Sequence, residues 1–465
     1  MSFRLKKFKL DEPKIQTSWV RLTDNNESND NYFTVVIGNN GTGKSRFLRG
    51  IATEFRKKGK DRYGLFNENG SGDEPSKLIA ITTSLSDKFP QEYNFSRFDK
   101  ESNLEDYYCY LGPRGRVGGS SSRALMDRAI SSLMAKSNNH DLYHQYNEIF
   151  DYLKYEPVIK LEYRLSIPKE FNELVGELSG AELKSFIRKR SELRSGIRQG
   201  TYNKFLGFDD EYWSELANAY TYAIENNYLG GGRKFSFVIN FSSENIGRKG
   251  QVISSSELYR YELFDDLRKL DLMKNMRVKL YKKGGGEFDY TDASSGEASI
   301  LSTLIGLVPN LENDCLILID EPEISLHPSW QYRYIELLDR LLKSVCGCHV
   351  IIATHSHFLI SDLPNHRSSV VHFKTSKGNH IDVEYYKGDT NGMSAEDILL
   401  NIFDLPSTRN YYLNAIVTEL LELLAEGKKG NPRYIQLSQK IKEIKPNLKS
   451  IDPLFDVIQK LIELG

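Results

Sequence analysis

The 465-residue sequence has few cysteines, no long apolar run and almost no net charge. Its four cysteines, Cys109, Cys315, Cys346 and Cys348, are scattered, which suits a reducing cytoplasm. No stretch of about 18 apolar residues occurs, and the strand-like N-terminus lacks the apolar centre of a secretory signal. The net charge of −1 is less basic than is usual for a protein that binds nucleic acid. These absences predict a soluble, cytoplasmic globular protein.

A glycine-rich segment, GNNGTGKS at 38–45, matches the phosphate-binding pattern G-x-x-x-x-G-K-[ST]. A β-branched strand pattern precedes it, and a helical pattern follows it. Its glycines let backbone N–H groups approach phosphates, and the helix N-terminus adds partial positive charge. Lys44 is predicted to reach the β- and γ-phosphates, and Ser45 to ligate Mg²⁺. The predicted ATP contacts of this loop are Asn39, Asn40, Gly41, Thr42, Gly43, Lys44, Ser45 and Arg46.

Two apolar strands further along the chain each end in polar residues. LILIDEPEISLHP (316–328) carries Asp320, a predicted Mg²⁺ ligand, and Glu321, predicted to orient and deprotonate the attacking water. IIATHSH (351–357) carries His355, a predicted contact of the γ-phosphate. Such unalternating strands indicate a parallel sheet covered on both faces, and ligand sites lie at its carboxyl ends. A surface acidic pair and a structural histidine are the alternatives.

The segment TDASSGEASIL (291–301) places small polar residues directly before an apolar helix. Ser294, Ser295 and Gly296 would present a hydroxyl and free N–H groups at the helix N-terminus, a second anion-binding surface. Glu297 in the first turn suits the helix dipole. An ordinary capped helix start is the alternative. Because the segment lies between the glycine loop and the Asp320 strand, we expect Ser294, Ser295, Gly296 and Glu297 to contact ATP.

Together these four motifs resemble the ABC-class ATPase head found in SMC proteins, RecF-like repair proteins and phage-defence ATPases. GNNGTGKS resembles the Walker A motif, LILIDEPE the Walker B motif with its catalytic glutamate, and ATHSH the switch-histidine loop. DASSGEAS resembles the LSGGE-type signature, with Ala293 for leucine and Ser295 for the first glycine. The resemblance implies ATP and Mg²⁺ as cofactors. It also implies a head-to-tail dimer, in which Ser294 and Gly296 of one copy face Lys44 of the other.

Within this class, EPEISLHPSWQ and THSHFLISD are similar to the branch that includes the overcoming-lysogenization-defect nucleases and the Septu and PARIS defence ATPases. TSLSDKFP (83–90) and YYCYLGPRG (107–115) also resemble ATPases of the Septu kind. The usual Q-loop glutamine is not evident, and Gln91 is the nearby candidate. No nuclease motif is visible. The resemblance therefore implies a separate nuclease subunit, of the HNH type in a Septu-like pair or of the Toprim type.

The expected fold is α/β: an ABC-type ATPase head with a mixed sheet, a helical insertion between Walker A and signature, and a C-terminal helical bundle. The predicted divisions are 1–120 and 273–390 for the two ATPase lobes, 121–272 for the insertion and 391–465 for the helical end. Strands are expected at 2–9, 15–20 and 32–37. Helices of the insertion are expected at 121–136, 140–154, 181–197 and 210–226, with a strand at 156–168.

The predicted function is an ATP-binding, ATP-hydrolysing regulatory subunit of a bacterial anti-phage system that controls a separate nuclease. The alternatives are a RecF- or SMC-like repair ATPase, a transporter ATPase, and a scaffold that binds ATP without hydrolysing it. The basic run at 186–199 is either a solvated helix face or a contact for nucleic acid or a partner. Arg114 and Arg116 either contact an anion or decorate a turn.

Overall fold

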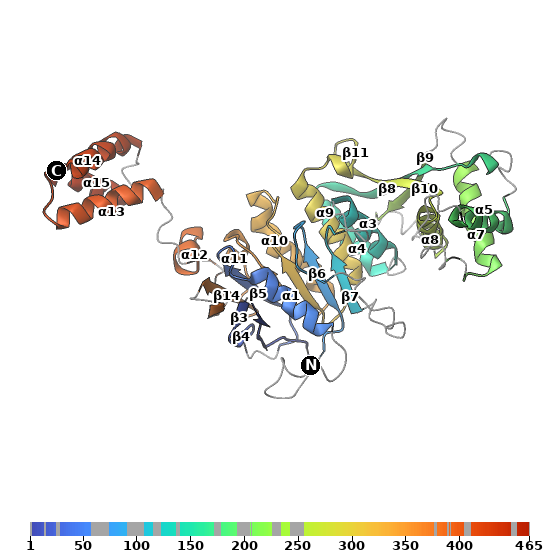
Figure 1. Cartoon of the computed structure of the whole chain (residues 1–465), viewed down its shortest axis with the longest axis horizontal. Helices are drawn as coiled ribbons and strands as arrows, with labels where there is room; N and C mark the ends of the chain where they lie inside the picture. Colours follow the sequence, from blue (N-terminus) through green and yellow to red (C-terminus); the bar gives the residue numbers. More distant parts are fainter. Residues whose placement is uncertain are drawn as a thin grey trace. The chain divides into compact units, whose positions relative to one another are not determined.

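A computed structural model describes most of the chain (Figure 1). The described residues are 2–13, 15–24, 28–56, 74–90, 107–114, 122–135, 140–171, 178–192, 205, 207–225, 234–241, 255–375, 379–387, 390, 392–403, 411–447 and 453–464. They form two compact units, an N-terminal unit (1–391) and a C-terminal unit (392–465). The four-part division expected from the sequence remains a prediction.

The N-terminal unit is built on a nine-stranded mixed sheet in the order β2-β3-β15-β14-β5-β13-β12-β6-β7. The strands are β2 (Asp11–Glu12), β3 (Ile15–Thr17), β15 (His380–Lys387), β14 (Ser368–Thr375), β5 (Tyr32–Gly38), β13 (His349–Ala353), β12 (Leu316–Asp320), β6 (Leu78–Thr82) and β7 (Tyr108–Leu111). From β14 to β7 all neighbours are parallel, whereas the β14–β15 and β2–β3 pairs are antiparallel. The expected α/β fold with a mixed sheet is confirmed.

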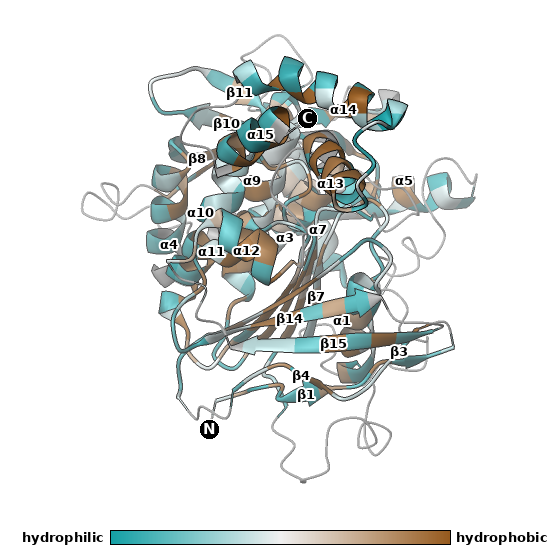
Figure 2. Ribbon diagram, turned by 90° about the vertical axis from the view of Figure 1, so that its left-hand side faces the viewer, coloured by the Kyte–Doolittle hydropathy of each residue, from teal (hydrophilic) through white to brown (hydrophobic). Residues whose placement is uncertain are grey.

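Every residue of β5, β12, β13, β6 and β7 is buried, which explains why these segments read as unbroken apolar runs. They are largely brown in Figure 2. Helix α1 (Lys44–Phe55) covers one face, with Phe47, Leu48 and Ile51 in the same core cluster as residues of β12 and β13. The parallel pairing sets Asp320 level with Ala353 of β13 and Thr82 of β6. The carboxyl ends of the three strands therefore share one edge, and the motif residues lie there.

A second, antiparallel sheet has the order β11-β10-β8-β9. Its strands are β11 (Glu287–Asp289), β10 (Met273–Lys282), β8 (Tyr155–Leu165) and β9 (Lys234–Asn240). The helices of this part are α3 (Ser122–Ala135), α4 (His140–Tyr152), α5 (Gly180–Glu192), α7 (Asp210–Glu225) and α8 (Ser255–Lys269). All four expected helices of the insertion are present, and α8 was not anticipated. Helix α3 packs along α9 (Ser295–Leu307), the helix that follows the signature segment.

The expected strand at 2–9 is wrong. Only β1 (Lys7–Phe8) pairs, with β4 (Val20–Arg21), in a separate two-stranded ladder. The apolar side chains whose alternation suggested a strand do face the core, since Phe3, Leu5 and Phe8 are buried. The backbone N–H groups of Phe3 and Leu5, however, donate to the side chains of Asp314 and His349 rather than to a neighbouring strand. The expected strand at 15–20 is likewise divided between β3 and β4.

The C-terminal unit contains α12 (Ala395–Asn401), α13 (Tyr411–Ala425), α14 (Pro432–Ile444) and α15 (Pro453–Leu464). The last three helices share one apolar core, which includes Leu420, Tyr434, Ile441 and Ile458. In Figure 2, α13 is mostly brown, whereas α14 carries both teal and brown turns. Within the described residues, no helix combines the length and the apolar character that crossing a membrane requires.

Candidate nucleotide site

The glycine loop between β5 and α1 has the backbone that phosphate binding requires. Gly41 and Gly43 have φ of 82° and 89°, a region that side chains disfavour. A Cβ on Gly38 would lie 2.4 Å from the carbonyl oxygen of Phe373 in β14. The Thr42 hydroxyl closes the loop by donating to the carbonyl of Asn39 at 2.8 Å. Asn39, Asn40 and Gly41 are exposed, so the loop presents its backbone to solvent.

Lys44 is buried at the carboxyl ends of the strands and is held by hydrogen bonds. Its Nζ donates to the carbonyl of Gly38 at 2.9 Å and lies 2.8 Å from His355 Nε2. Burial lowers its pKa to about 8, although the carboxylates at the end of β12 act in the opposite direction. Such an ammonium gains favourable interactions when an anion arrives. The side chain of Arg46, also predicted to contact ATP, lies 3.7 Å from Glu12 of β2.

Asp320 and Ser45 fit a Mg²⁺ site. The Asp320 side chain is buried, and its Oδ1 atom has no hydrogen-bond partner within the part of the chain that the structure describes. Burial raises the pKa of this carboxyl to about 7, and the Ser45 hydroxyl, which hydrogen-bonds it, acts in the opposite direction. A buried carboxylate oxygen without a partner is unusual. Mg²⁺ prefers such oxygen ligands and needs few of them when phosphates supply the others.

Glu321 and His355 meet across the edge of the sheet. His355 Nε2 lies 3.6 Å from Glu321 Oε1, and the same nitrogen contacts Lys44. The neighbouring imidazole of His355, together with Lys44, holds the pKa of Glu321 below its ordinary value, which keeps the carboxylate ionised, as a base must be. Glu321 has φ of 49°, a strained backbone for a residue with a side chain. The three predicted catalytic residues, Lys44, Glu321 and His355, therefore share one site.

Two residues without a predicted role hold the switch-histidine loop. Glu323 Oε1 accepts the backbone N–H of His355 at 2.5 Å. Gln331, in α10 (Pro328–Leu341), accepts the Ser356 hydroxyl at 2.7 Å and donates to the carbonyl of Leu326 at 2.9 Å. The sequence could have indicated a role for Glu323, because it is a second carboxylate only two residues after Glu321. Nothing local distinguishes Gln331 from any other polar residue of a helix.

The signature turn forms an intact helix cap that faces solvent. Ser294 and Glu297 make a capping box, in which the Ser294 hydroxyl accepts the Glu297 N–H and the Glu297 carboxylate accepts the Ser294 N–H. Ser294 and Ser295 are exposed, so a partner can reach them. Glu297 is also bonded to Lys282 at 3.0 Å and Tyr155 at 3.2 Å, which turns its carboxylate toward its own chain. A Cβ on Gly296 would lie 2.5 Å from the carbonyl oxygen of Ser325.

Comparisons with known proteins agree with this geometry. The family model described as "AAA domain, putative AbiEii toxin, Type IV TA system" matches residues 167–361. The Septu protein PtuA of Bacillus thuringiensis is 27% identical over 161 residues, which cover 30% of this chain and 38% of that protein. The Retron Vc95 probable ATPase of Vibrio cholerae serotype O1 biovar El Tor is 26% identical over 100 residues, 19% of each chain. The resemblance to ABC-like P-loop ATPases of phage defence is confirmed.

Other similarities are more limited. Protein ea59 of Escherichia phage lambda is 39% identical to this protein over 71 residues, 15% of this chain and 13% of that protein. The chain thus spans well under two thirds of the length of each of these curated relatives. A crystal structure of the SmcHead bound to the C-winged helix domain of ScpA matches 83% of this chain and 98% of its own at 12% identity, with a TM-score of 0.30. A TM-score this low does not establish a common fold.

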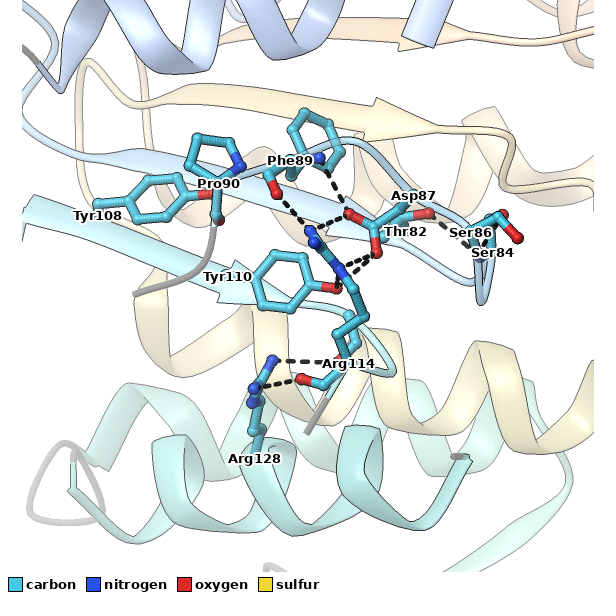
Figure 3. Close-up of polar contacts among 11 residues, drawn as sticks. Thr82, Ser84, Ser86, Asp87, Phe89, Pro90, Tyr108, Tyr110, Arg114 and Arg128 are labelled. Atoms are coloured by element: carbon cyan, nitrogen blue, oxygen red, sulfur yellow. Dashed lines mark hydrogen bonds and ion pairs between the residues drawn. The ribbon is translucent and has the colours of Figure 1, made fainter. Parts of the chain in front are cut away.

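The arginines whose role the sequence left open have partners within the described structure. Arg114 binds the carboxylate of Asp87 through two nitrogens, so it is not free to contact an anion (Figure 3). In the basic run at 186–199, Arg188 pairs with Glu192 at 3.3 Å and Arg190 with Asp271 at 3.0 Å, whereas residues 193–199 lie outside the described structure. Both interpretations of this run remain predictions. Gln91 and Arg116 lie outside the described residues.

Proposed function

We propose that this protein binds and hydrolyses MgATP as the regulatory subunit of a bacterial anti-phage defence complex in the cytoplasm. Two copies would close head to tail over ATP, and the nucleotide state would control a separate nuclease subunit. The convergence of Lys44, Glu321 and His355 on one edge of the sheet carries the proposal. The similarity to PtuA and to a retron ATPase supports the defence role.

The surroundings of each residue favour a specific role in ATP binding or hydrolysis. The glycine loop and Lys44 bind the phosphates, and His355 contacts the γ-phosphate. Glu321, ionised beside His355, orients the attacking water and takes its proton. Mg²⁺, held by Ser45 and Asp320, would neutralise charge on the phosphates. The exposed Ser294 and Ser295 complete the site from the second copy, because both residues lie at the N-terminus of α9, where the helix dipole favours an anion.

Hydrolysis is tested with Glu321→Gln in a phosphate-release assay. The amide has the shape of the carboxylate but cannot take a proton, so turnover should fall by about 10²–10⁴-fold while ATP binding remains. Glu336→Gln, at a half-buried position on α10 whose carboxylate pairs with Arg340, is the matched control and should behave like wild type. Wild type that binds MgATP but releases no phosphate would instead support the non-hydrolysing scaffold.

The composite site is tested by mixing two inactive variants, Lys44→Ala and Ser294→Arg. In a head-to-tail heterodimer, one site combines both defects and the other combines the intact Lys44 of one copy with the intact Ser294 of the other. The mixture should therefore recover roughly a quarter of wild-type turnover, since about half of the dimers are mixed and each has one good site. A mixture as inactive as its components would show that both residues act within one copy.

Ser294→Arg also removes a helix cap, and the chain offers a matched control. Ser394 forms the same capping box with Asp397 at the start of α12. Ser394→Arg should lose a similar cap, about 1 kcal/mol, without losing turnover. Ser294→Arg alone should bind ATP nearly as wild type does. Weaker ATP binding with unchanged turnover per bound ATP would contradict the dimer.

The nuclease partner is tested with the reading frame adjacent to this gene. We expect it to encode an HNH or Toprim protein that copurifies with the ATPase and whose cleavage of nucleic acid depends on the nucleotide present. A neighbour of another kind, together with ATP-dependent binding of DNA by the ATPase alone, would favour the repair ATPase. Copurification with a membrane-spanning partner would favour the transporter ATPase.

A further inference from the structure

A buried carboxylate, Asp87, anchors the loop that follows β6. Its side chain is fully buried and accepts two hydrogen bonds from Arg114, at 2.7 and 2.6 Å (Figure 3). The Tyr110 hydroxyl donates to it at 2.8 Å and the Phe89 N–H at 3.0 Å. Arg114 also donates to the carbonyl of Phe89. A bidentate pair of this kind fixes geometry as well as charge, so it attaches residues 87–89 to the segment that follows β7.

This loop lies beside Asp320, the predicted Mg²⁺ ligand of the nucleotide site. Thr82, the last residue of β6, lies beside Asp320 in the parallel ladder. The next residue, Thr83, directs its hydroxyl toward the carbonyl of Glu321 at 3.4 Å. Residues 83–90 therefore leave the sheet next to the two carboxylates that the proposed reaction uses. A shift of the loop would move the neighbours of Asp320 and Glu321.

The other end of the same network reaches the signature helix through α3. Arg128 of α3 donates to the carbonyl of Arg114 at 2.5 Å and to that of Gly112 at 3.1 Å. Its guanidinium lies 4.8 Å from the centre of the Tyr110 ring. Helix α3 packs along α9, whose first turn contains Ser295 and Gly296. Asp87, Arg114 and Arg128 therefore connect the edge of β6 to the helix that begins with the signature turn.

We propose that Arg114 is a positioning residue that joins the Asp320–Glu321 edge to the signature helix through Asp87 and Arg128. This inference rests on the proposed function, because it describes how one copy prepares both halves of the composite site. Arg114 contacts neither the glycine loop nor Lys44 in the described structure, so it sets turnover and dimer closure rather than ATP affinity. The guanidinium of Arg114 is needed to hold Asp87 in a fixed geometry, since a lysine supplies the positive charge without two fixed donors.

The test compares Arg114→Lys with wild type by kcat, by the KM for MgATP and by thermal unfolding. Lysine retains the charge beside Asp87, which favours folding, but it loses the bidentate geometry. We expect kcat to fall about tenfold or more, because small displacements in a reactive site cost this much, with KM within about twofold. Arg188→Gln, which removes an exposed arginine–glutamate pair, is the control and should match wild type. Wild-type kcat in Arg114→Lys, or a matching rise in KM, would overturn the inference.

Arg128→Gln tests the same connection if Arg114→Lys does not fold. It leaves the Asp87–Arg114 pair intact and removes only the link to α3, so kcat should again fall with KM unchanged. Dimer formation on adding MgATP, measured by sedimentation in the Glu321→Gln background, separates this inference from the proposed function. A wild type without turnover would refute the enzyme, yet impaired dimer formation by the Arg128 variant would still support the connection. Unimpaired dimer formation and turnover in this variant would refute it.

Discussion

Replacing Asp320 with asparagine should make the metal-free protein more stable at alkaline pH. Burial raises the pKa of this carboxyl from its ordinary value of 3.8 to about 7, so its ionised form is costly inside the folded protein. Each pKa unit corresponds to about 1.4 kcal/mol, which puts the cost of the ionised group at ~4 kcal/mol above pH 7. Asparagine keeps the shape and an oxygen acceptor and carries no charge.

The pH dependence follows from the same shift. Between pH 3.8 and about 7 the folded protein holds a proton on Asp320 that the unfolded chain has released. Stability contributed by this proton is therefore lost as the pH rises through that window. The free energy of unfolding of Asp320→Asn should exceed that of wild type by the largest amount at pH 8. This difference should be smaller by roughly 3 kcal/mol at pH 5, where the wild-type carboxyl is neutral in the folded state.

The assay is urea denaturation in EDTA at pH 8 and pH 5. Asp382→Asn, an exposed position on β15, is the control and should show little difference between the two pH values. Asp320→Asn should also abolish Mg²⁺-dependent turnover, because it removes the predicted metal ligand. The reasoning about this buried carboxylate would be refuted if Asp320→Asn were no more stable than wild type at pH 8. It would also be refuted if the difference in free energy of unfolding between the variant and wild type were the same at both pH values.

Three further variants test separate parts of the structure. Gly296→Ala should cost about 1–3 kcal/mol in denaturation, because the new Cβ meets the Ser325 carbonyl at 2.5 Å, whereas Ser295→Ala should change little. His349 is fully buried with a lowered pKa, so stability should fall below pH 6.5 by up to about 1.4 kcal/mol per unit, and His349→Gln should flatten that dependence. Ile441→Ala should weaken the C-terminal unit by about 2–5 kcal/mol in hydrogen exchange without changing turnover. Unchanged exchange would contradict the shared core of α13–α15.

The strands that carry the nucleotide site could be predicted because their environment is uniform. β5, β12 and β13 are buried on both faces, so each must be apolar throughout, and that pattern is visible in one segment alone. The segment at 2–9 shows where this reasoning stops. Alternating burial is shared by a paired strand and by an extended segment whose N–H groups bond to Asp314 and His349 side chains.

Within the site, the position of a residue was predictable where it follows from a local pattern, and the chemical roles remain predictions. Lys44, Asp320, Glu321 and His355 belong to motifs whose spacing is set by a strand and the turn after it. Arg46 belongs to such a motif too, yet its position beside Glu12 depends on a hairpin formed by another segment.

The sequence by itself determined which groups are available for phosphate and metal binding, because a glycine loop, a buried strand and a helix cap are each built from consecutive residues. Only the tertiary structure decided that Lys44 meets His355, 311 residues away, and that Glu323 holds the switch loop. It also decided that Arg114 binds Asp87 rather than an outside anion. Such choices depend on which segments become neighbours when the apolar strands assemble, and hydrogen bonds between distant side chains leave no periodic trace in the chain.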